Sequence, residues 1–371
     1  MGSSVNLGRI WGIPIGLHVS WFLIFGLVTW SLALGYFPLE HPDLGTQTYW
    51  LLGGVTSLLF FGSVLLHELG HAFLALRNQI PVRGITLFIF GGVAQIGQEP
   101  RSPGAEFRIA IAGPIVSLGL AALFGGLWLL DQQIPMLAAP SMWLARINFI
   151  LAAFNMIPGF PLDGGRVFRA IVWKFTGDFR RATQVAATMG QFIAFAFIAF
   201  GMFTVLRGNF FNGLWLVFIG WFLQNAAAAS YQQLHLRELL KGVRVEQVMA
   251  PGCPQISGRS PLTEIVEDHI LPAGQRCFLV AENGHPRGLL TFRDVTKVPR
   301  TDWNSVRVSE VMVPWNRLVQ VNPKMELLDV LDLMDNSDVA QLPVVEANQL
   351  VGMVTRDQVL HYVRTRSEIG V

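Results

Sequence analysis

Long runs of apolar residues dominate the first 235 or so positions of the chain and then give way to a mixed pattern. A membrane-spanning helix needs about 20 mostly apolar residues. Six stretches meet that requirement, and we expect each of them to form a transmembrane helix. They cover roughly residues 13–34, 50–76, 108–130, 141–157, 183–206 and 210–230. The pattern therefore predicts a polytopic α-helical membrane domain.

The segment from Val82 to Gln98 breaks this helical pattern. Apolar β-forming residues alternate through residues 85–89, and the pair Gly91-Gly92 follows them, which is typical of a β-hairpin. An unpaired strand edge cannot face lipid, so the hairpin must lie against protein or a wet cavity. Such an edge could accept an extended peptide as an additional strand.

Charge divides the chain at the same place. Residues 1–235 hold 12 Lys and Arg and 8 Asp and Glu, whereas the remaining 136 residues hold 15 and 17. The whole chain is 52% hydrophobic and 14% charged, which excludes a single soluble globule, a disordered protein and a secreted disulfide scaffold. The net charge of +2 gives no reason to expect nucleic acid as a partner. Both cysteines, Cys253 and Cys277, lie in the polar part, where a cytosolic domain needs no disulfide.

The loops predict the orientation, because basic residues concentrate on the cytoplasmic side of a membrane. Loops 35–49 and 131–140 contain no Lys or Arg, whereas basic residues follow the second, fourth and sixth stretches. We therefore expect a multi-pass protein of the cell membrane with both termini and the polar domain in the cytoplasm. The basic residues are Arg77, Arg83, Arg101, Arg108, Arg166, Arg169, Lys174, Arg180, Arg181, Arg237, Lys241 and Arg244.

Three ionisable residues interrupt the second apolar stretch, in the order His67-Glu68-Leu69-Gly70-His71. His67 and His71 are one helical turn apart, so they share a face and can bind one zinc ion. Glu68 lies beside them and can act as a general base toward water at the metal. The alternative is a set of polar residues that only bond to neighbouring helices, but ionisable groups in an apolar span need a stronger reason.

A catalytic zinc site usually has three protein ligands and one open position. Asp163 is the candidate for the third ligand, because it is the only carboxylate between Asp131 and Asp178 and falls at the cytoplasmic end of the fourth stretch. The pair Gly164-Gly165 beside it lets backbone segments approach closely. The alternative is that Asp163 is an N-cap that opens the next helix at Gly164.

These motifs resemble those of the intramembrane site-2 protease metallopeptidases. The resemblance covers the apolar part and rests on the His67–His71 motif, on Glu106 to Pro114, and on Asn155 with residues 158–165. It implies zinc held by His67, His71 and Asp163, with Glu68 as general base. It also implies that the Asn155 side chain helps to hold the substrate backbone or the oxyanion, the alternative being an interhelical hydrogen bond.

The resemblance implies regulated intramembrane proteolysis, in which a transmembrane helix of a single-pass protein unwinds and is cut within or near the lipid bilayer. The substrate would be an anti-sigma factor or a membrane-anchored regulator. Unwinding is a physical requirement, because helical hydrogen bonds shield the scissile carbonyl from attack. The predicted hairpin resembles the family element that holds the unwound strand, which makes Ile89, Gly91 and Gly92 candidate substrate contacts.

Residues 244–365 contain an internal repeat. Val248-Met249 matches Val311-Met312 at an offset of 63, and residues 288–294 match residues 352–358 at an offset of 64. Amphipathic segments and short β runs give each copy the order strand, helix, strand, strand, helix. This order resembles a tandem pair of cystathionine-β-synthase (CBS) domains. The predicted domains are a transmembrane metalloprotease domain at 1–235, a linker at 236–243, and soluble α/β CBS domains at 244–302 and 303–371.

CBS pairs bind adenine nucleotides, so the resemblance implies ATP, ADP or AMP as a second ligand. Thr291 would contact a phosphate and Asp294 a ribose, and Thr355 is the counterpart of Thr291 in the second repeat. Gln358 stands where the second ribose carboxylate would be, so at most one of the two sites is complete. The alternative is a structural pair that only mediates contacts or a homodimer.

A rival class remains open from the sequence. A cation transporter or channel with a CBS-type gate would also combine six membrane helices with such a polar domain. Glu68 and Asp163 would then bind the translocated cation. Zinc content separates the two classes, because only the protease needs the histidine pair as metal ligands.

Overall fold

The computed structural model describes residues 4–89, 91–130, 132–250, 253–282, 285–337, 339–347 and 349–369. The chain forms two compact units, Met1–Gln232 and Gln233–Val371. Helix α8 (Phe210–Leu240) begins in the first unit and ends in the second, so it runs through part of the predicted linker at 236–243. The side chains of residues 230–238 lie outside the described part of the structure.

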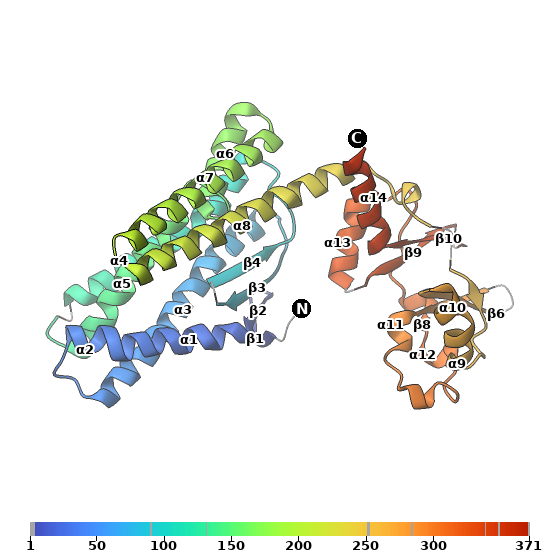
Figure 1. The fold of residues 1–371 in the computed structure, drawn as a ribbon, viewed down its shortest axis with the longest axis horizontal. Coiled ribbons are helices and arrows are strands. Elements are labelled where there is room, and N and C mark those ends of the chain that lie inside the picture. The colour runs from blue at the N-terminus through green and yellow to red at the C-terminus, as the bar shows by residue number, and fades with distance from the viewer. Residues whose placement is uncertain are drawn as a thin grey trace. The chain divides into compact units, whose positions relative to one another are not determined.

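The first unit combines long helices with a small sheet (Figure 1). Its elements are, in chain order, β1 (Ser4–Ile10), β2 (Ile13–His18), α1 (Val19–Ser31), the π-helix η1 (Leu32–Tyr36), α2 (Phe37–Glu40), α3 (Thr46–Arg77), β3 (Val82–Phe88), β4 (Gly91–Ile96), α4 (Pro103–Leu130), α5 (Pro135–Asn155), α6 (Asp163–Thr176), α7 (Phe179–Leu206) and the first part of α8.

Six helices among the described residues are long and apolar enough to cross a membrane, which confirms the six predicted spans. Several of them extend beyond the apolar stretches, because polar residues in a first turn do not interrupt a helix. Helix α4, for example, begins at Pro103 rather than near residue 108. The six spans are Val19–Glu40, Thr46–Arg77, Pro103–Leu130, Pro135–Asn155, Phe179–Leu206 and Phe210–Ala229.

The first apolar stretch is not helical throughout, and in this respect the prediction was wrong. Residues Ile13–His18 form strand β2, and helix α1 begins only at Val19. Pro14 and Gly16 disfavour a helix there, and residues Ile13–His18 alternate between buried and partly exposed positions, as in a strand. His18 then caps α1, since its Nδ1 accepts a hydrogen bond from the Ser20 amide at 3.2 Å.

The predicted hairpin is present as β3 and β4, but it belongs to a larger sheet in the order β1-β2-β3-β4. Strands β2 and β3 are parallel, and β3 and β4 are antiparallel. Ile13, Ile15 and Ile85 of the sheet pack with Leu69 and Ala72 of α3. The sheet is thereby fixed beside the helix that carries the histidine pair, and β4 is one of its edges among the described strands.

The second unit contains short helices and two sheets. Strands β5, β6, β7 and β8 form one sheet in that order, and β9 pairs with β10 in the other. Its elements are η2 (Val245–Gln247), β5 (Gln255–Ile256), α9 (Leu262–Ile265), η3 (Val266–Ile270), α10 (Leu271–Ala273), β6 (Cys277–Glu282), β7 (His285–Thr291), α11 (Phe292–Val295), η4 (Arg300–Asp302), α12 (Val308–Val311), β8 (Val313–Pro314), η5 (Trp315–Arg317), α13 (Leu327–Ser337), β9 (Gln341–Glu346), β10 (Gln349–Thr355) and α14 (Arg356–Glu368).

The internal repeat is visible in this unit as two antiparallel hairpins, β6–β7 and β9–β10, whose residue ranges differ by the same 64 positions as the sequence motif. Strands β7 and β10 have the same sequence of exposed and buried positions. Each hairpin leads into a helix that begins after a threonine, Thr291 or Thr355. Each repeat has its own apolar core, centred on residues such as Phe278 in the first and Val344 in the second.

The two cysteines form a disulfide, Cys253–Cys277, with their Cα atoms 5.6 Å apart. The sequence indicates no need for a disulfide in this domain, and the structure corrects that interpretation. Strand β5 pairs with β6 in parallel, and Gln255 lies opposite Leu279. The same offset of 24 positions places Cys253 opposite Cys277, and this pairing could not be read from the cysteine spacing alone.

Candidate metal centre

Helix α3 presents two imidazole rings to the interior of the first unit. His67 and His71 are four residues apart on one face of the helix and are only 3% and 4% exposed. Their Nε2 atoms lie 3.3 Å apart, so the lone pairs of both rings converge on one point.

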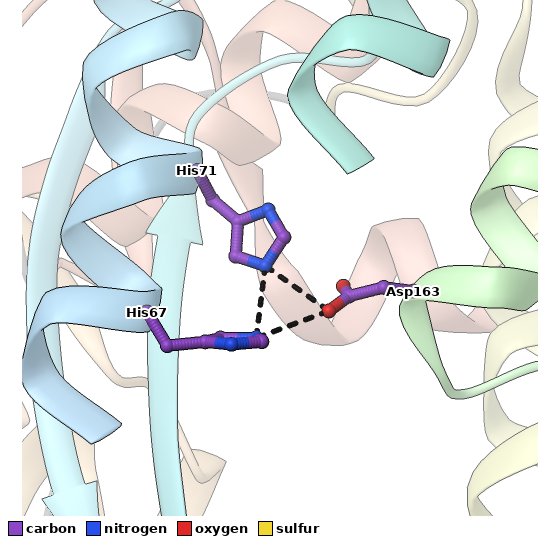
Figure 2. Close-up of side chains that lie close together, drawn as sticks. All are labelled: His67, His71 and Asp163. Carbon is purple, nitrogen blue, oxygen red and sulfur yellow. Dashed lines mark hydrogen bonds and ion pairs between the residues drawn. The ribbon is translucent and has the colours of Figure 1, made fainter. Parts of the chain in front are cut away.

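The third group comes from a segment almost a hundred residues later. Asp163 is the first residue of α6, and its Oδ2 atom lies 3.1 Å from Nε2 of His67 and 3.1 Å from Nε2 of His71. Figure 2 shows the two rings on α3 and the carboxylate at the start of α6 pointing toward one another. The N-cap position of α6 is Leu162, so the alternative interpretation of Asp163 as the N-cap is wrong.

The Nδ1 atom of each imidazole ring contacts a polar group of helix α4. Nδ1 of His71 donates a hydrogen bond to the backbone carbonyl of Ile109 at 2.7 Å. Nδ1 of His67 lies 2.9 Å from the hydroxyl of Ser117. Both contacts come from α4, and they leave the Nε2 lone pairs facing Asp163, as in many metal sites in which a second group fixes the ring.

A glycine keeps the space between the three groups open. A Cβ atom at Gly113 of α4 would lie 2.6 Å from Nε2 of His67 and would also collide with the ring of His71. The donor atoms are 3.1–3.3 Å apart. Ligands about 2.0–2.1 Å from a tetrahedral zinc ion are separated by about 3.3 Å, so this donor set fits zinc.

The segment before α6 explains how Asp163 reaches the histidines. Helix α5 ends at Asn155, and a short turn leads into α6. A Cβ atom at Gly165 would lie 2.5 Å from the Phe160 amide nitrogen, and Gly164 is equally close to the backbone at Met156. The double glycine therefore permits the close backbone approach that the sequence predicts.

The carboxyl group of Asp163 is held in its ionised form. Burial by itself raises the pKa of Asp163. When the Nε2 atoms carry protons instead of a metal, the charge on His71 and the hydrogen bonds from both rings outweigh burial and lower this pKa well below its usual value. A metal ligand must be deprotonated, and Asp163 meets this requirement.

Glu68 lies next to this cluster and faces the sheet. Its Oε2 atom accepts a hydrogen bond of 3.2 Å from the backbone amide of Ala94 in β4. A Cβ atom at Gly92 would lie 2.5 Å from Cγ of Glu68, so strand β4 can approach this closely only because residue 92 is glycine. The carboxylate is thus placed between the metal-binding groups and the edge strand.

The structure also describes three further residues that the sequence predicts as substrate contacts. Ile89 is in the turn between β3 and β4, and its amide donates to the hydroxyl of Ser20 at 3.3 Å. Gly91 is the first residue of β4. Asn155 is the last residue of α5 and is half-buried, and its side chain makes no hydrogen bond within the described part of the chain, so the alternative of an interhelical bond finds no support.

Comparison with known proteins identifies the family. The model of Peptidase family M50 matches residues 55–136 and 130–198. A protein of Synechocystis sp. that is named as a zinc metalloprotease is 36% identical over 98% of this chain and 97% of its own length. The chain belongs to peptidase family M50. A second M50 relative, named as the zinc metalloprotease Rip3 of Mycobacterium tuberculosis, is 34% identical over 97% of this chain and 92% of its own length.

Two further comparisons concern the separate parts of this M50 peptidase. The CBS domain model matches residues 308–365. The solved site-2 protease of Methanocaldococcus jannaschii is 30% identical, covers 62% of this chain and 95% of its own, and gives a TM-score of 0.42. This M50 peptidase is a zinc metalloprotease with a CBS domain and six helices apolar enough for a multi-pass membrane protein. Family membership decides against the interpretation as a cation transporter or channel.

Sequence reasoning missed several groups that surround the metal-binding residues of the M50 peptidase. Gly113 and the carbonyl of Ile109 both lie within the stretch Glu106 to Pro114, which carried part of the resemblance, but nothing in the sequence told which residue faces the histidines. Ser117 follows one turn later on α4, and its position four residues after Gly113 is the signal that could have found it.

The predicted nucleotide contacts of the M50 peptidase have a local structural role. Thr291 and Asp294 form a capping box at the start of α11: the hydroxyl of Thr291 donates to Asp294 Oδ2 at 2.6 Å. Lys297 donates to Oδ1 of Asp294 at 2.8 Å. Thr355 and Gln358 form the same capping box at the start of α14. The Thr-x-x-Asp pattern therefore stabilises helices in addition to any role toward a ligand.

Proposed function

We propose that this M50 peptidase is an intramembrane endopeptidase in which His67, His71 and Asp163 hold one zinc ion and Glu68 is the general base. The convergence of three donor atoms 3.1–3.3 Å apart around an open space is the observation that carries this proposal. When zinc is bound, it supplies Lewis acidity, which lowers the pKa of water and polarises a peptide carbonyl. Glu68 accepts the proton of the attacking water and returns it to the leaving peptide nitrogen.

The substrate proposed for this site is an unwound transmembrane segment that pairs with the outer edge of β4. The amide of Ala94 points away from β3 toward Glu68, which supports this arrangement. A peptide along that edge would place a backbone carbonyl beside the base, because main-chain pairing sets the register of an added strand. Gly91 leaves open space beside the strand, and Gly92 lets the Glu68 carboxylate reach it. Ile89 fixes the end of the hairpin. The amide of Asn155, which has no hydrogen-bond partner among the described residues, would bind the peptide or the oxyanion.

The protein substrate would be a single-pass membrane protein of the anti-sigma factor or membrane-anchored regulator type, cut within or near the lipid bilayer. The basic loops after the second, fourth and sixth helices support an orientation with both termini and the CBS pair in the cytoplasm. A homodimer through the CBS pair is part of the same proposal. Size measurement of the detergent-solubilised full chain tests it, and a monomer at all concentrations would contradict it.

The decisive experiment incubates the purified full chain with a panel of single-pass substrates. We expect cleavage by the parent, loss of cleavage on addition of a chelator, and recovery with zinc. Glu68→Gln should abolish cleavage and still contain one zinc ion per chain. Glu40→Gln, at the end of α2 and away from the site, is the matched control and should cleave normally. A metal-free parent, or cleavage by the Glu68 variant, would refute the proposal.

A second part of the proposal is that adenine nucleotide at the CBS pair tunes cleavage. The first repeat carries the complete Thr291 and Asp294 pair, whereas the second has Thr355 with Gln358, so one site is expected. The ribose would have to share Asp294 with the capping box, which is feasible because a carboxylate accepts about four hydrogen bonds. Cleavage should change on addition of ATP, ADP or AMP, and Asp294→Asn should remove the change. A rate that no nucleotide alters would contradict this part.

A further inference from the structure

A buried charge cluster lies behind the metal centre. Arg169 of α6 is 6% exposed and follows Asp163 by six residues on the same helix. Its Nε donates a hydrogen bond of 2.6 Å to Oε1 of Glu106 on α4, and Nη2 forms an ion pair with the same oxygen. Nη2 also lies 3.4 Å from Oε2 of Glu99, in the loop after β4. In the sequence Arg169 is one of the basic loop residues that indicate the cytoplasmic side. In the structure Arg169 is instead a buried residue that forms an ion pair.

Two aromatic rings complete the surroundings of this guanidinium. Its Cζ lies 5.0 Å from the ring centre of Phe160, in the turn before Asp163, and 4.7 Å from that of Phe179, at the start of α7. Such cation–π contacts stabilise a charge most where water is excluded. Arg169 therefore connects its own helix with α4, α7, the loop after β4 and the turn that leads to Asp163.

Burying these charged groups costs free energy, so a contribution to stability does not by itself explain why they are present. Glu106 is fully buried, and its Oε2 atom has no hydrogen-bond partner within the described part of the chain. A buried ion pair often contributes less to stability than apolar residues of the same size, and the best-attested reason to retain one is that it specifies a particular arrangement.

The arrangement that this cluster specifies is the position of α6 relative to α4. Helix α4 supplies Gly113 and the groups that fix both histidine rings, so it sets where the two imidazoles point. Helix α6 supplies Asp163 from its first residue, where a helix is least constrained by its own hydrogen bonds. The Glu106–Arg169 pair is the charged link between these two helices.

We propose that Arg169, acting through Glu106, is a positioning residue that holds Asp163 within coordinating distance of the metal. The inference rests on the proposed function, because it requires Asp163 to be a ligand. Ligand distances tolerate changes of only about 0.2 Å, so a small slide of α6 along α4 is enough to weaken coordination. Glu99 joins the cluster from the loop after β4, so the edge strand and the metal ligand share one anchor.

A double-mutant cycle on zinc affinity tests this inference. Zinc affinity of the solubilised full chain is measured by competition with a chromogenic chelator for the parent, Arg169→Met, Asp163→Ala and the double variant. We expect Arg169→Met to weaken zinc binding by about 10-fold or more, within the range for groups that support metal ligands. In the Asp163→Ala background the same change should have no further effect, because its route to the metal is already gone. Lys174→Met, exposed on the same helix, is the matched control.

The outcomes separate three explanations. If Arg169→Met lowers zinc affinity equally in the parent and in the Asp163→Ala background, the residue has a general structural role and the inference is overturned. Parent zinc affinity in the Arg169→Met single variant would also overturn it. If Asp163→Ala alone binds zinc like the parent, the ligand assignment fails, and the proposed function fails with it. Should Arg169→Met not fold, Glu106→Leu combined with Arg169→Met removes both charges and restores folding. That variant should still bind zinc more weakly, and parent affinity in it would overturn the inference.

Discussion

Gly113→Ala gives the sharpest test of the metal centre, because it adds one methyl group at a known place. The new Cβ atom would lie 2.6 Å from Nε2 of His67 and 2.7 Å from Cε1 of His71. Both neighbours are rings that α4 itself fixes through Ser117 and the Ile109 carbonyl. They cannot retreat from the methyl group without giving up those hydrogen bonds.

The size of the effect follows from these distances. Non-bonded carbon atoms are ordinarily about 3.5–4.0 Å apart, so the rings or α4 must move by about 1 Å. Metal–ligand distances tolerate only about 0.2 Å. Removing a mere supporting contact weakens metal binding by about 10–100-fold, so displacing the ligands themselves should cost at least about 100-fold. This corresponds to about 2.7 kcal/mol of binding free energy.

The assay is zinc content by mass spectrometry together with zinc affinity by chelator competition on the full chain. Gly119→Ala is the matched control, because it lies on the same helix and its Cβ atom would meet nothing within 4 Å. Both substitutions favour the helix by up to about 1 kcal/mol, so neither should unfold α4. If both Gly113→Ala and Gly119→Ala bind zinc as tightly as the parent, the ion does not lie where the three donor atoms converge.

Three other outcomes follow from particular contacts. Ser117→Ala removes the partner of His67 Nδ1 and should weaken zinc binding by about 10–100-fold in the chelator assay, whereas Ser141→Ala, buried on α5, should not. Thr291→Ala and Thr355→Ala each remove the hydroxyl of a helix cap and should each lower stability by about 1 kcal/mol in calorimetry of the full chain, and an unchanged transition would refute the capping role. Alkylation of the denatured protein should label neither Cys253 nor Cys277 until a reductant is added, and labelling without reductant would exclude the disulfide.

The sequence predicted those features that depend on local pattern. The six apolar stretches correspond to six helices long enough to span a membrane, and the 64-residue offset reappears in the two hairpins of the second unit. The spacing of His67 and His71 places them on one face because an α-helix repeats every 3.6 residues. Asp163 could be selected because so few carboxylates occur in the apolar part.

Features that depend on contacts between distant segments could not be predicted in this way. Residues 13–18 read as the start of a helix by hydropathy, but pairing with β3 makes them a strand. Arg169 reads as a loop charge, but its partner Glu106 lies 63 positions earlier on another helix. The disulfide depends on the register of β5 against β6, which no spacing rule contains.

The partners of the metal-binding groups explain why this site is hard to reconstruct from residue types. His71 is oriented by the carbonyl of Ile109, and Glu68 is held by the amide of Ala94. Every residue type supplies a backbone carbonyl, and nearly every type supplies an amide. The residue types at positions 109 and 94 therefore do not reveal these two hydrogen bonds. The sequence does show where a side chain is missing. Gly92 and Gly113 are the positions at which Glu68 and the histidine rings approach the backbone. In this protein the glycines therefore delimit the site as much as the histidines do, because a buried metal needs space that every other residue would fill.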